Sequence, residues 1–114
     1  MWIETNTMIG ISQISKDFND LIRMMKKYGS AIIMKNNMPV YIAFSPNDFD
    51  KDNMPSINIR EVSRNLSKLT YILYDAGCAV VTRNNKPIVV LYDFNIIKNS
   101  NMGNIQIIKG GIKC

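Results

Sequence analysis

The sequence contains no histidine and only two cysteines, Cys78 and Cys114. The absence of histidine excludes a histidine general base, the Ser-His and Cys-His nucleophile couples, and histidine-ligated metal. Two cysteines are too few for a cysteine-rich zinc site. No apolar run reaches the ~18 residues of a membrane-spanning helix, and the N-terminal segment lacks the basic region and apolar core of a secretion signal. We therefore expect a cytoplasmic protein with reduced thiols, no membrane contact, and no metal or other cofactor.

The charge of the chain is concentrated in its second half. The net charge is +5 over 114 residues. Residues 1–50 hold five basic and five acidic side chains, whereas residues 51–114 hold nine basic and four acidic ones. A basic half favours a polyanionic partner, most often nucleic acid, although a solvated lysine-rich surface would have the same composition.

A repeat with a shift of 48 residues organises the sequence. Residues 9–49 align without gaps to residues 57–97. Turn, cap and core positions coincide in this register, which indicates an internal duplication. The identical pairs are Ile9/Ile57, Ile11/Ile59, Ser15/Ser63, Leu21/Leu69, Gly29/Gly77, Ala31/Ala79, Asn36/Asn84, Asn37/Asn85, Pro39/Pro87 and Asn47/Asn95.

Each copy predicts the same order of elements. A short Ile-x-Ile strand precedes apolar residues at the spacing of one helical face, and we expect Ser12 to cap this helix in the first copy. Gly29 and Gly77 follow the helices, where a left-handed residue ends a helix. An Asn-Asn pair between two apolar runs predicts a β-hairpin. Ser45 and Pro46 predict the cap and first residue of a short helix.

The predicted fold is therefore α+β, with two β-α-β-β-(short α) repeats packed as a pseudo-two-fold single domain over residues 1–114. One copy of ~40 residues is too small to bury a core alone, so we expect the two copies to pack together. The predicted parts are repeat 1 over 9–49, a linker over 50–56, repeat 2 over 57–97, and a C-terminal tail over 98–114 with one strand-like piece from Ile105 to Ile108.

The second copy resembles the Phd/YefM antitoxin fold, the DNA-binding module of many bacterial toxin–antitoxin operon repressors. The likeness rests on residues 61–67 of the expected helix and 81–87 around the hairpin turn. The first copy carries weaker versions of both segments, at 13–18 and 34–39. Members of this family dimerise through the module and bind operator DNA, and a C-terminal segment neutralises a toxin. The resemblance implies a dimer fused into one chain.

The same resemblance implies DNA contacts at Arg64 and Arg83, with Lys16 and Lys35 as the matching positions in the first copy. In the sequence, Lys16 and Arg64 follow the first turn of a helix, where we expect the N-terminal dipole to favour phosphate. Lys35 and Arg83 precede a tight turn. Because arginine can bond guanine bidentately, we expect more specificity from the second copy. Further candidates are Arg60 and Lys86 for phosphate, and the turn amides Asn36, Asn37, Asn84 and Asn85.

Plainer explanations exist for every candidate. The turns alone account for the asparagines, and the cations could be solvated or paired within the chain. The leading interpretation is a non-enzymatic repressor that binds double-stranded operator, plasmid or phage DNA. The alternatives are a protein-interaction module, such as a toxin-neutralising antitoxin or an inhibitor, and a structural pseudo-dimer that self-associates. The short tail lacks an amphipathic pattern, which argues against the usual toxin contact, and the weaker charge of the first copy favours a partner other than DNA.

Overall fold

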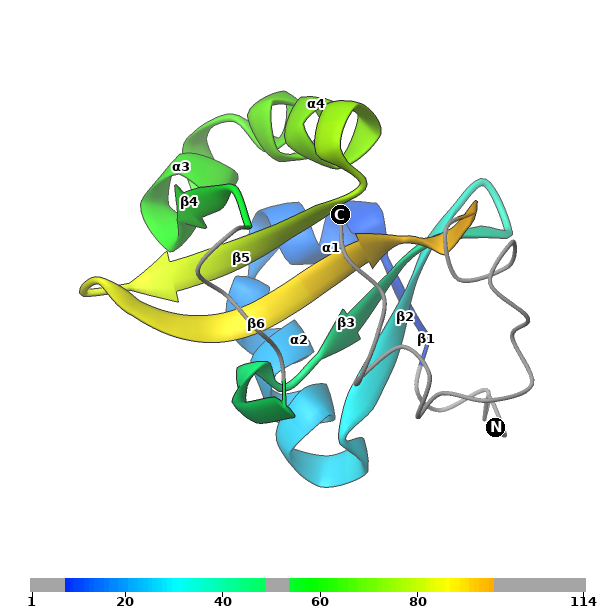
Figure 1. Cartoon of the computed structure of the whole chain (residues 1–114). Coiled ribbons are helices and arrows are strands. Elements are labelled where there is room, and N and C mark those ends of the chain that lie inside the picture. The colour runs from blue at the N-terminus through cyan, green and yellow to red at the C-terminus, as the bar shows by residue number, and fades with distance from the viewer. Residues whose placement is uncertain (1–7, 49–53, 96–114) are drawn as a thin grey trace.

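The computed structural model describes residues 8–48 and 54–95. These residues form an α+β domain with a mixed six-stranded sheet and four helices, so the predicted α+β class is confirmed (Figure 1). The first half consists of β1 (Met8–Gly10), α1 (Ile11–Lys16), α2 (Phe18–Tyr28), β2 (Ser30–Lys35), β3 (Met38–Phe44) and the 3-10 helix η2 (Pro46–Asp48). The second half consists of β4 (Ser56–Asn58), α3 (Ile59–Arg64), α4 (Leu66–Ala76), β5 (Cys78–Arg83) and β6 (Lys86–Asp93).

Each half has two helices where the sequence predicts one. An extended residue interrupts the helix, with φ of −152° at Asp17 and −149° at Asn65. The Asp17 carboxylate accepts a hydrogen bond from the Asn19 backbone N–H at 3.0 Å and so caps α2. The apolar spacing hides this break, because Ile14 before it and Phe18 after it are buried in the same core. The prediction of one continuous helix is therefore wrong.

The predicted ends of the helices are confirmed, whereas the predicted cap at the start of the first helix is not. Gly29 and Gly77 adopt φ of 83° and 84° and end α2 and α4, as predicted. Ser12, however, is not a cap. Gly10 precedes α1 and makes no side-chain cap bond, whereas its counterpart Asn58 caps α3 through its side chain. Ser12 is the second residue of α1, because the helix starts directly after β1.

Both predicted hairpins are present. Asn36 and Asn84 have φ of 52°, and Asn37 and Asn85 have φ of 63°. Two successive positive φ values match the twist of the flanking strands and close a two-residue hairpin loop, and asparagine tolerates this conformation. The two turns therefore have the same backbone geometry, and any difference between the hairpins lies in their side chains.

The strand order of the sheet is β1-β2-β3-β6-β5-β4. The two outer pairs are parallel and the three inner pairs are antiparallel. Each strand and each α-helix of the first half has a counterpart that begins 48 residues later. Ala43 on β3 pairs with Leu91 on β6, which is its own counterpart, so a local two-fold axis passes between these residues. Ser56 belongs to β4, so the predicted linker is one residue too long at this end.

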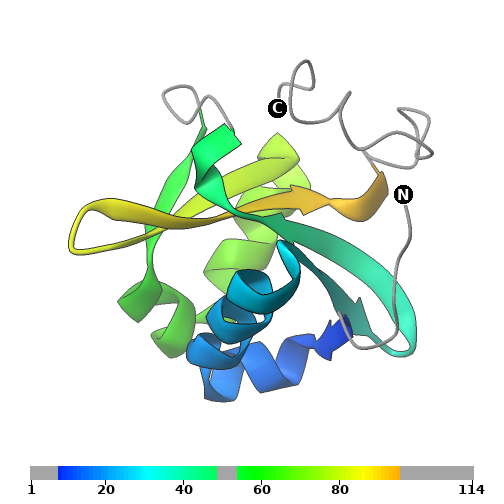
Figure 2. The ribbon, with the colours of Figure 1, turned by 90° about the horizontal axis from the view of Figure 1, so that it is seen from below.

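All four helices cover one face of the sheet (Figure 2). The core on that face combines helix side chains such as Leu21, Val62 and Leu73 with inward-facing residues of the strands. A second buried cluster lies on the opposite face and includes Phe44 and Tyr92. Their rings meet edge to face, with centroids 6.2 Å apart and planes at 71°. The central strands therefore carry buried side chains on both faces.

Two further expectations concern the cysteines and the membrane. Cys78 is fully buried and is disulfide-bonded, so the expectation of a reduced thiol is wrong for this residue. Within residues 8–48 and 54–95, no helix has the length and apolar character needed to cross a membrane. The predicted strand from Ile105 to Ile108 and the rest of the tail lie outside the described residues.

Candidate nucleic-acid interface

The tip of the β5–β6 hairpin carries four of the predicted residues. Arg83 ends β5 and lies opposite Lys86, which begins β6. Asn84 and Asn85 form the turn between them. All four side chains are exposed, so the tip presents two cations and two amides together. In Figure 1 this hairpin, in yellow, extends to the left of the sheet.

The start of α3 lies beside this tip because β4, which leads into α3, pairs in parallel with β5. The register places Asn58 opposite Thr82, next to Arg83. The Asn58 Oδ1 accepts a hydrogen bond from the Arg60 backbone N–H at 2.8 Å and fixes the first turn of α3. The two elements enclose an open hollow of about 410 Å³, and no acidic residue lines it. Its lining residues are Asn58, Ile59, Arg60, Arg83, Asn84 and Asn85.

Arg83 is held by the other half of the chain. Its Nη2 donates a hydrogen bond to the Asn19 Oδ1 of α2 at 2.9 Å. A guanidinium group has several N–H donors, so one bond orients the group and leaves other donors for a ligand. Arg83 is thus both exposed and paired within the chain. The sequence alone did not single out Asn19, because the contact joins residues 64 positions apart.

A second hollow of about 310 Å³ lies on the other side of Arg83, between the two halves. It brings Lys26 near Arg83, and it holds no acidic residue. Lys26 was not among the predicted site residues, since in the sequence it is only a polar residue in the last turn of a helix. The other lining residues are Ile22, Met25, Ser45, Pro46, Asn47, Pro87 and Ile88.

Arg64 and Lys16 lie elsewhere, and their predicted rationale is wrong. Both are in the last turn of a helix, Arg64 in α3 and Lys16 in α1, because the extended residues Asn65 and Asp17 end these helices. The C-terminal dipole of a helix favours cations and does not attract phosphate. Both side chains are exposed, but neither lines either hollow.

The first hairpin offers a weaker version of the same surface. Lys35 ends β2 and lies opposite Met38, whose side chain is 64% exposed. The counterpart of Arg60 in this half is Ser12. The matching surface therefore has one cation where the second half has three. Lys35 lines neither of the two hollows.

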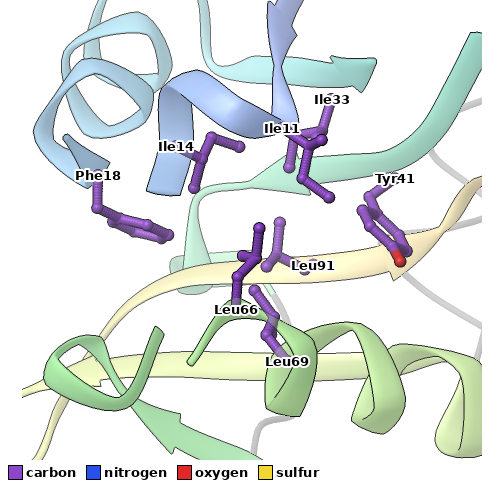
Figure 3. Close-up of a pocket in the computed structure, with 8 residues that line it drawn as sticks. All are labelled: Ile11, Ile14, Phe18, Ile33, Tyr41, Leu66, Leu69 and Leu91. Atoms are coloured by element: carbon purple, nitrogen blue, oxygen red, sulfur yellow. The ribbon is translucent and has the colours of Figure 1, made fainter. Parts of the chain in front are cut away.

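An enclosed apolar gap lies between the helices and the sheet, at the join of the two halves (Figure 3). Its volume is only about 10 Å³, which is about the space of a single water. Eight side chains surround it, and only that of Tyr41 carries a polar atom. This gap is a packing defect of the core and offers no room for a substrate. The lining residues are Ile11, Ile14, Phe18, Ile33, Tyr41, Leu66, Leu69 and Leu91.

The described part of the chain contains no group of three or more cysteine, aspartate or glutamate side chains that could hold a metal ion. Of the predicted residues, the structure brings Arg60, Arg83, Asn84 and Asn85 together around one hollow and places Lys86 opposite Arg83. No protein-family model, curated protein or solved structure matches the chain.

Proposed function

We propose that the protein is a non-enzymatic DNA-binding protein, an antitoxin-like transcriptional repressor of double-stranded operator DNA. The observation that carries the proposal is the convergence of Arg60, Arg83, Asn84 and Asn85 on one hollow that no acidic residue lines. Cations bind phosphate, and arginine and asparagine side chains are suited to the base edges of guanine and adenine. The hollow thus combines groups for positioning with groups for reading sequence.

The proposal includes a dimer of Phd/YefM-like repeats fused into one chain. The recurrence of elements at 48 residues and the pairing of Ala43 with Leu91 support this architecture. The two hairpin tips lie at opposite ends of the molecule in both views (Figures 1 and 2). The longest extent of the molecule is 34 Å, which is close to one turn of B-DNA, about 34 Å.

Within this proposal, Arg83 is the residue for base recognition. Its bond to Asn19 limits the freedom of the guanidinium before DNA arrives, which lowers the entropy cost of binding. Arg60 and Lys86 flank it and serve as phosphate contacts. Arg64, Lys16 and Lys35 are exposed cations further away and add attraction to phosphate without reading sequence.

The test is a titration of the purified protein with DNA from the region upstream of its gene, at two salt concentrations. We expect preference over random DNA and an affinity that falls steeply with salt, by about one logarithmic unit of slope per neutralised phosphate. Arg83→Glu should abolish the preference. Lys27→Glu is the matched control, because it changes the net charge equally and Lys27 lines neither hollow. No binding at low salt would refute the proposal.

The second candidate is a protein-interaction module, such as a toxin-neutralising antitoxin or an inhibitor. The observation that favours it is the exposed Met38 at the first hairpin, where the second hairpin has Lys86. Co-purification with the product of an adjacent, toxin-like reading frame would support this candidate. It would replace DNA binding if the complex formed while the DNA titration stayed negative.

A further inference from the structure

The hollow between the two halves has the size and the construction of a small-molecule site. Three parts of the chain form it: α2, Ser45 with η2, and Arg83 with the start of β6. Its volume of about 310 Å³ falls at the lower end of the range for ligand pockets, roughly 300–1,000 Å³. The hollow therefore has room for one small organic molecule.

The lining combines an apolar base with a cationic rim. Met25 is buried, and Ile22 and Ile88 are half-buried, whereas Lys26 and Arg83 are exposed. None of the described residues that line the hollow is acidic. An organic anion can therefore place its charge between the two cations and its hydrocarbon part on the apolar side chains. Small-molecule sites commonly pair an apolar lining with a few placed polar groups in this way.

Lys26 is the one cation of α2 that has no partner among the described residues. Arg23 pairs with Asp20. Lys27 lies over the Tyr28 ring, 5.3 Å from its centroid. Lys26 and Lys27 share the last turn of α2 and suit the helix dipole equally, so the dipole does not account for a lysine at the rim of the hollow. The Lys26 ammonium group is thus available to a ligand.

The two-fold relation of the halves provides an internal comparison. The equivalent surface of the other half lies between α4, the end of β6 and the first hairpin. There, Tyr74 stands in the place of Lys26, and Asp93 stands in the place of Ser45. The loss of an ammonium group and the gain of a carboxylate both disfavour an anion. The charge that suits an anion is therefore specific to one surface and does not follow from the duplicated scaffold.

We propose that this hollow binds a small organic carboxylate between the Lys26 ammonium and the Arg83 guanidinium. The hydrocarbon part of the ligand then packs on Ile22, Met25 and Ile88. The fork of a guanidinium group matches a carboxylate well. The apolar base favours a carboxylate over a phosphate monoester, because the monoester carries up to two charges and loses more hydration when it leaves water.

The site also provides a means of regulation, and this step rests on the proposed DNA contact. Arg83 lines both hollows, and its bond to Asn19 orients it. A carboxylate beside Arg83 neutralises its charge and occupies N–H donors of the group assigned to base recognition. Ligand and DNA therefore compete for one guanidinium group, and each should weaken the binding of the other by the same factor.

Benzoate is the probe for the site, and the full-length protein without DNA is the sample. In an NMR titration of isotope-labelled protein, the backbone amides of Lys26, Ser45 and Arg83 should shift together, with a dissociation constant of about a millimolar. Benzamide has the shape of benzoate without its charge, and acetate has the charge without the ring. Each of these two should bind at least about tenfold more weakly.

Two pairs of variants test the lining. Lys26→Ala should weaken benzoate binding about tenfold, whereas Lys27→Ala, one residue further and equal in charge, should leave it unchanged. Ser45→Asp should abolish binding, and Ser45→Asn, which has a similar shape without the charge, should retain it. The equivalent position of the other half holds Asp93, so we expect Ser45→Asp to fold, and circular dichroism checks this.

Competition on the DNA upstream of the gene tests the regulation. Saturating benzoate should lower the DNA affinity about fivefold or more relative to an equal concentration of acetate, which keeps the ionic strength the same. Lys26→Ala should remove this difference, and Lys27→Ala should keep it. A protein that binds no DNA would refute the proposed function, while the benzoate titration would still decide the ligand site.

Three results would overturn the ligand site. The first is the absence of shifts with benzoate. The second is equal affinity for benzoate and benzamide, which would show that the cations do not take part. The third is an equal loss of binding in Lys26→Ala and Lys27→Ala. A DNA affinity that bound benzoate leaves unchanged would overturn the regulation alone.

Discussion

The two hairpins have the same backbone and different side chains. Their turn asparagines share φ values of 52° and 63°. The pairing register of each hairpin also shifts at the matching place, between Ile33 and Met34 in the first and between Val81 and Thr82 in the second. Yet Arg83 and Lys86 face each other on the second hairpin, whereas Lys35 faces an exposed Met38 on the first. The scaffold is thus kept in both halves, while the groups that could contact a polyanion are concentrated in one.

Helices α2 and α4 likewise share their buried residues and differ in their exposed ones. Leu21 and Leu69, and Met25 and Leu73, are buried at matching positions of α2 and α4. On the outside, Asp20, Arg23 and Lys27 of α2 correspond to Lys68, Tyr71 and Asp75 of α4. Inward-facing positions keep their character because the shared core constrains them. The outward-facing positions are free of that constraint, so their differences are the better guide to function.

The largest effect should come from the core positions that the halves share. Leu21→Ala and Leu69→Ala should each reduce the free energy of unfolding by about 2–5 kcal/mol, because each leaves a cavity in one continuous core. Chemical denaturation followed by circular dichroism measures both losses. We expect a single transition in each variant. Two separate transitions would show that the halves fold independently.

The second-largest effect should come from exchanging the cations of the two halves, which should change DNA binding. Ser12→Arg with Met38→Lys gives the first half the cations of the second, and we expect the salt dependence of affinity to steepen by about two logarithmic units. Arg60→Ser with Lys86→Met makes the reverse change and should flatten it by a similar amount. Fluorescence anisotropy at several salt concentrations measures the slopes. Unchanged slopes in both variants would show that these positions do not contact the DNA.

The loss of stability at alkaline pH should depend on Tyr41 and Tyr92, whose counterparts in the other half of the chain cannot ionise. Burial, and then the carboxylate of Asp93, raise the pKa of Tyr41 above 10.0, and burial raises the pKa of Tyr92. Folding therefore favours the protonated phenols, and this stability is present below pH 10.0 and is lost as the pH rises through the folded pKa. The counterparts are Val89 and Phe44.

Thermal melts of Tyr41→Phe and Tyr92→Phe on both sides of pH 10 should show a shallower alkaline decline than the unchanged protein. An equally steep decline in the variants would assign the alkaline limit to other groups.

The smallest effect should come from the unequal helix caps. Gly10 and Asn58 have almost the same conformation, with φ of −75° and −74°, but only Asn58 makes a side-chain cap bond. A Cβ at Gly10 would meet nothing closer than the Ser12 hydroxyl at 3.9 Å. Gly10→Asn should therefore stabilise the protein by a few tenths of a kcal/mol. Asn58→Gly should cost about as much, and denaturant midpoints measure both. A loss at Gly10 would show that the cap cannot form there.

Local sequence signals predicted the fold wherever one residue decides the backbone. The glycines after α2 and α4 and the asparagines of both turns adopt the expected left-handed conformations. The spacing of apolar residues shows which side chains are buried, but not whether the helix is continuous. The break at Asp17 was therefore not predicted, because the residues on both sides of it face the same core. The failed Ser12 cap has a similar cause, since the sequence does not show how closely α1 follows β1.

The candidate site was predictable in part. The residues of the second hairpin tip and Arg60 follow from sequence position, because a turn and a helix start both project outward. The bond between Arg83 and Asn19, and the approach of Lys26 to Arg83, depend on how the halves pack. A single sequence contains no signal for contacts of that kind. Arg64 and Lys16 were predicted from the family resemblance and from the dipole of one continuous helix, whereas both residues lie in the last turn of a short helix.

The most direct test of a DNA-reading second half compares two double variants on the same upstream DNA, in the same salt. Arg60→Ala with Arg83→Ala should lower the affinity at least about tenfold and remove the preference over random DNA. Lys16→Ala with Lys35→Ala removes as many cations from the first half and should weaken binding to both DNAs equally. Equal loss of preference in the two double variants, or none in either, would contradict the account.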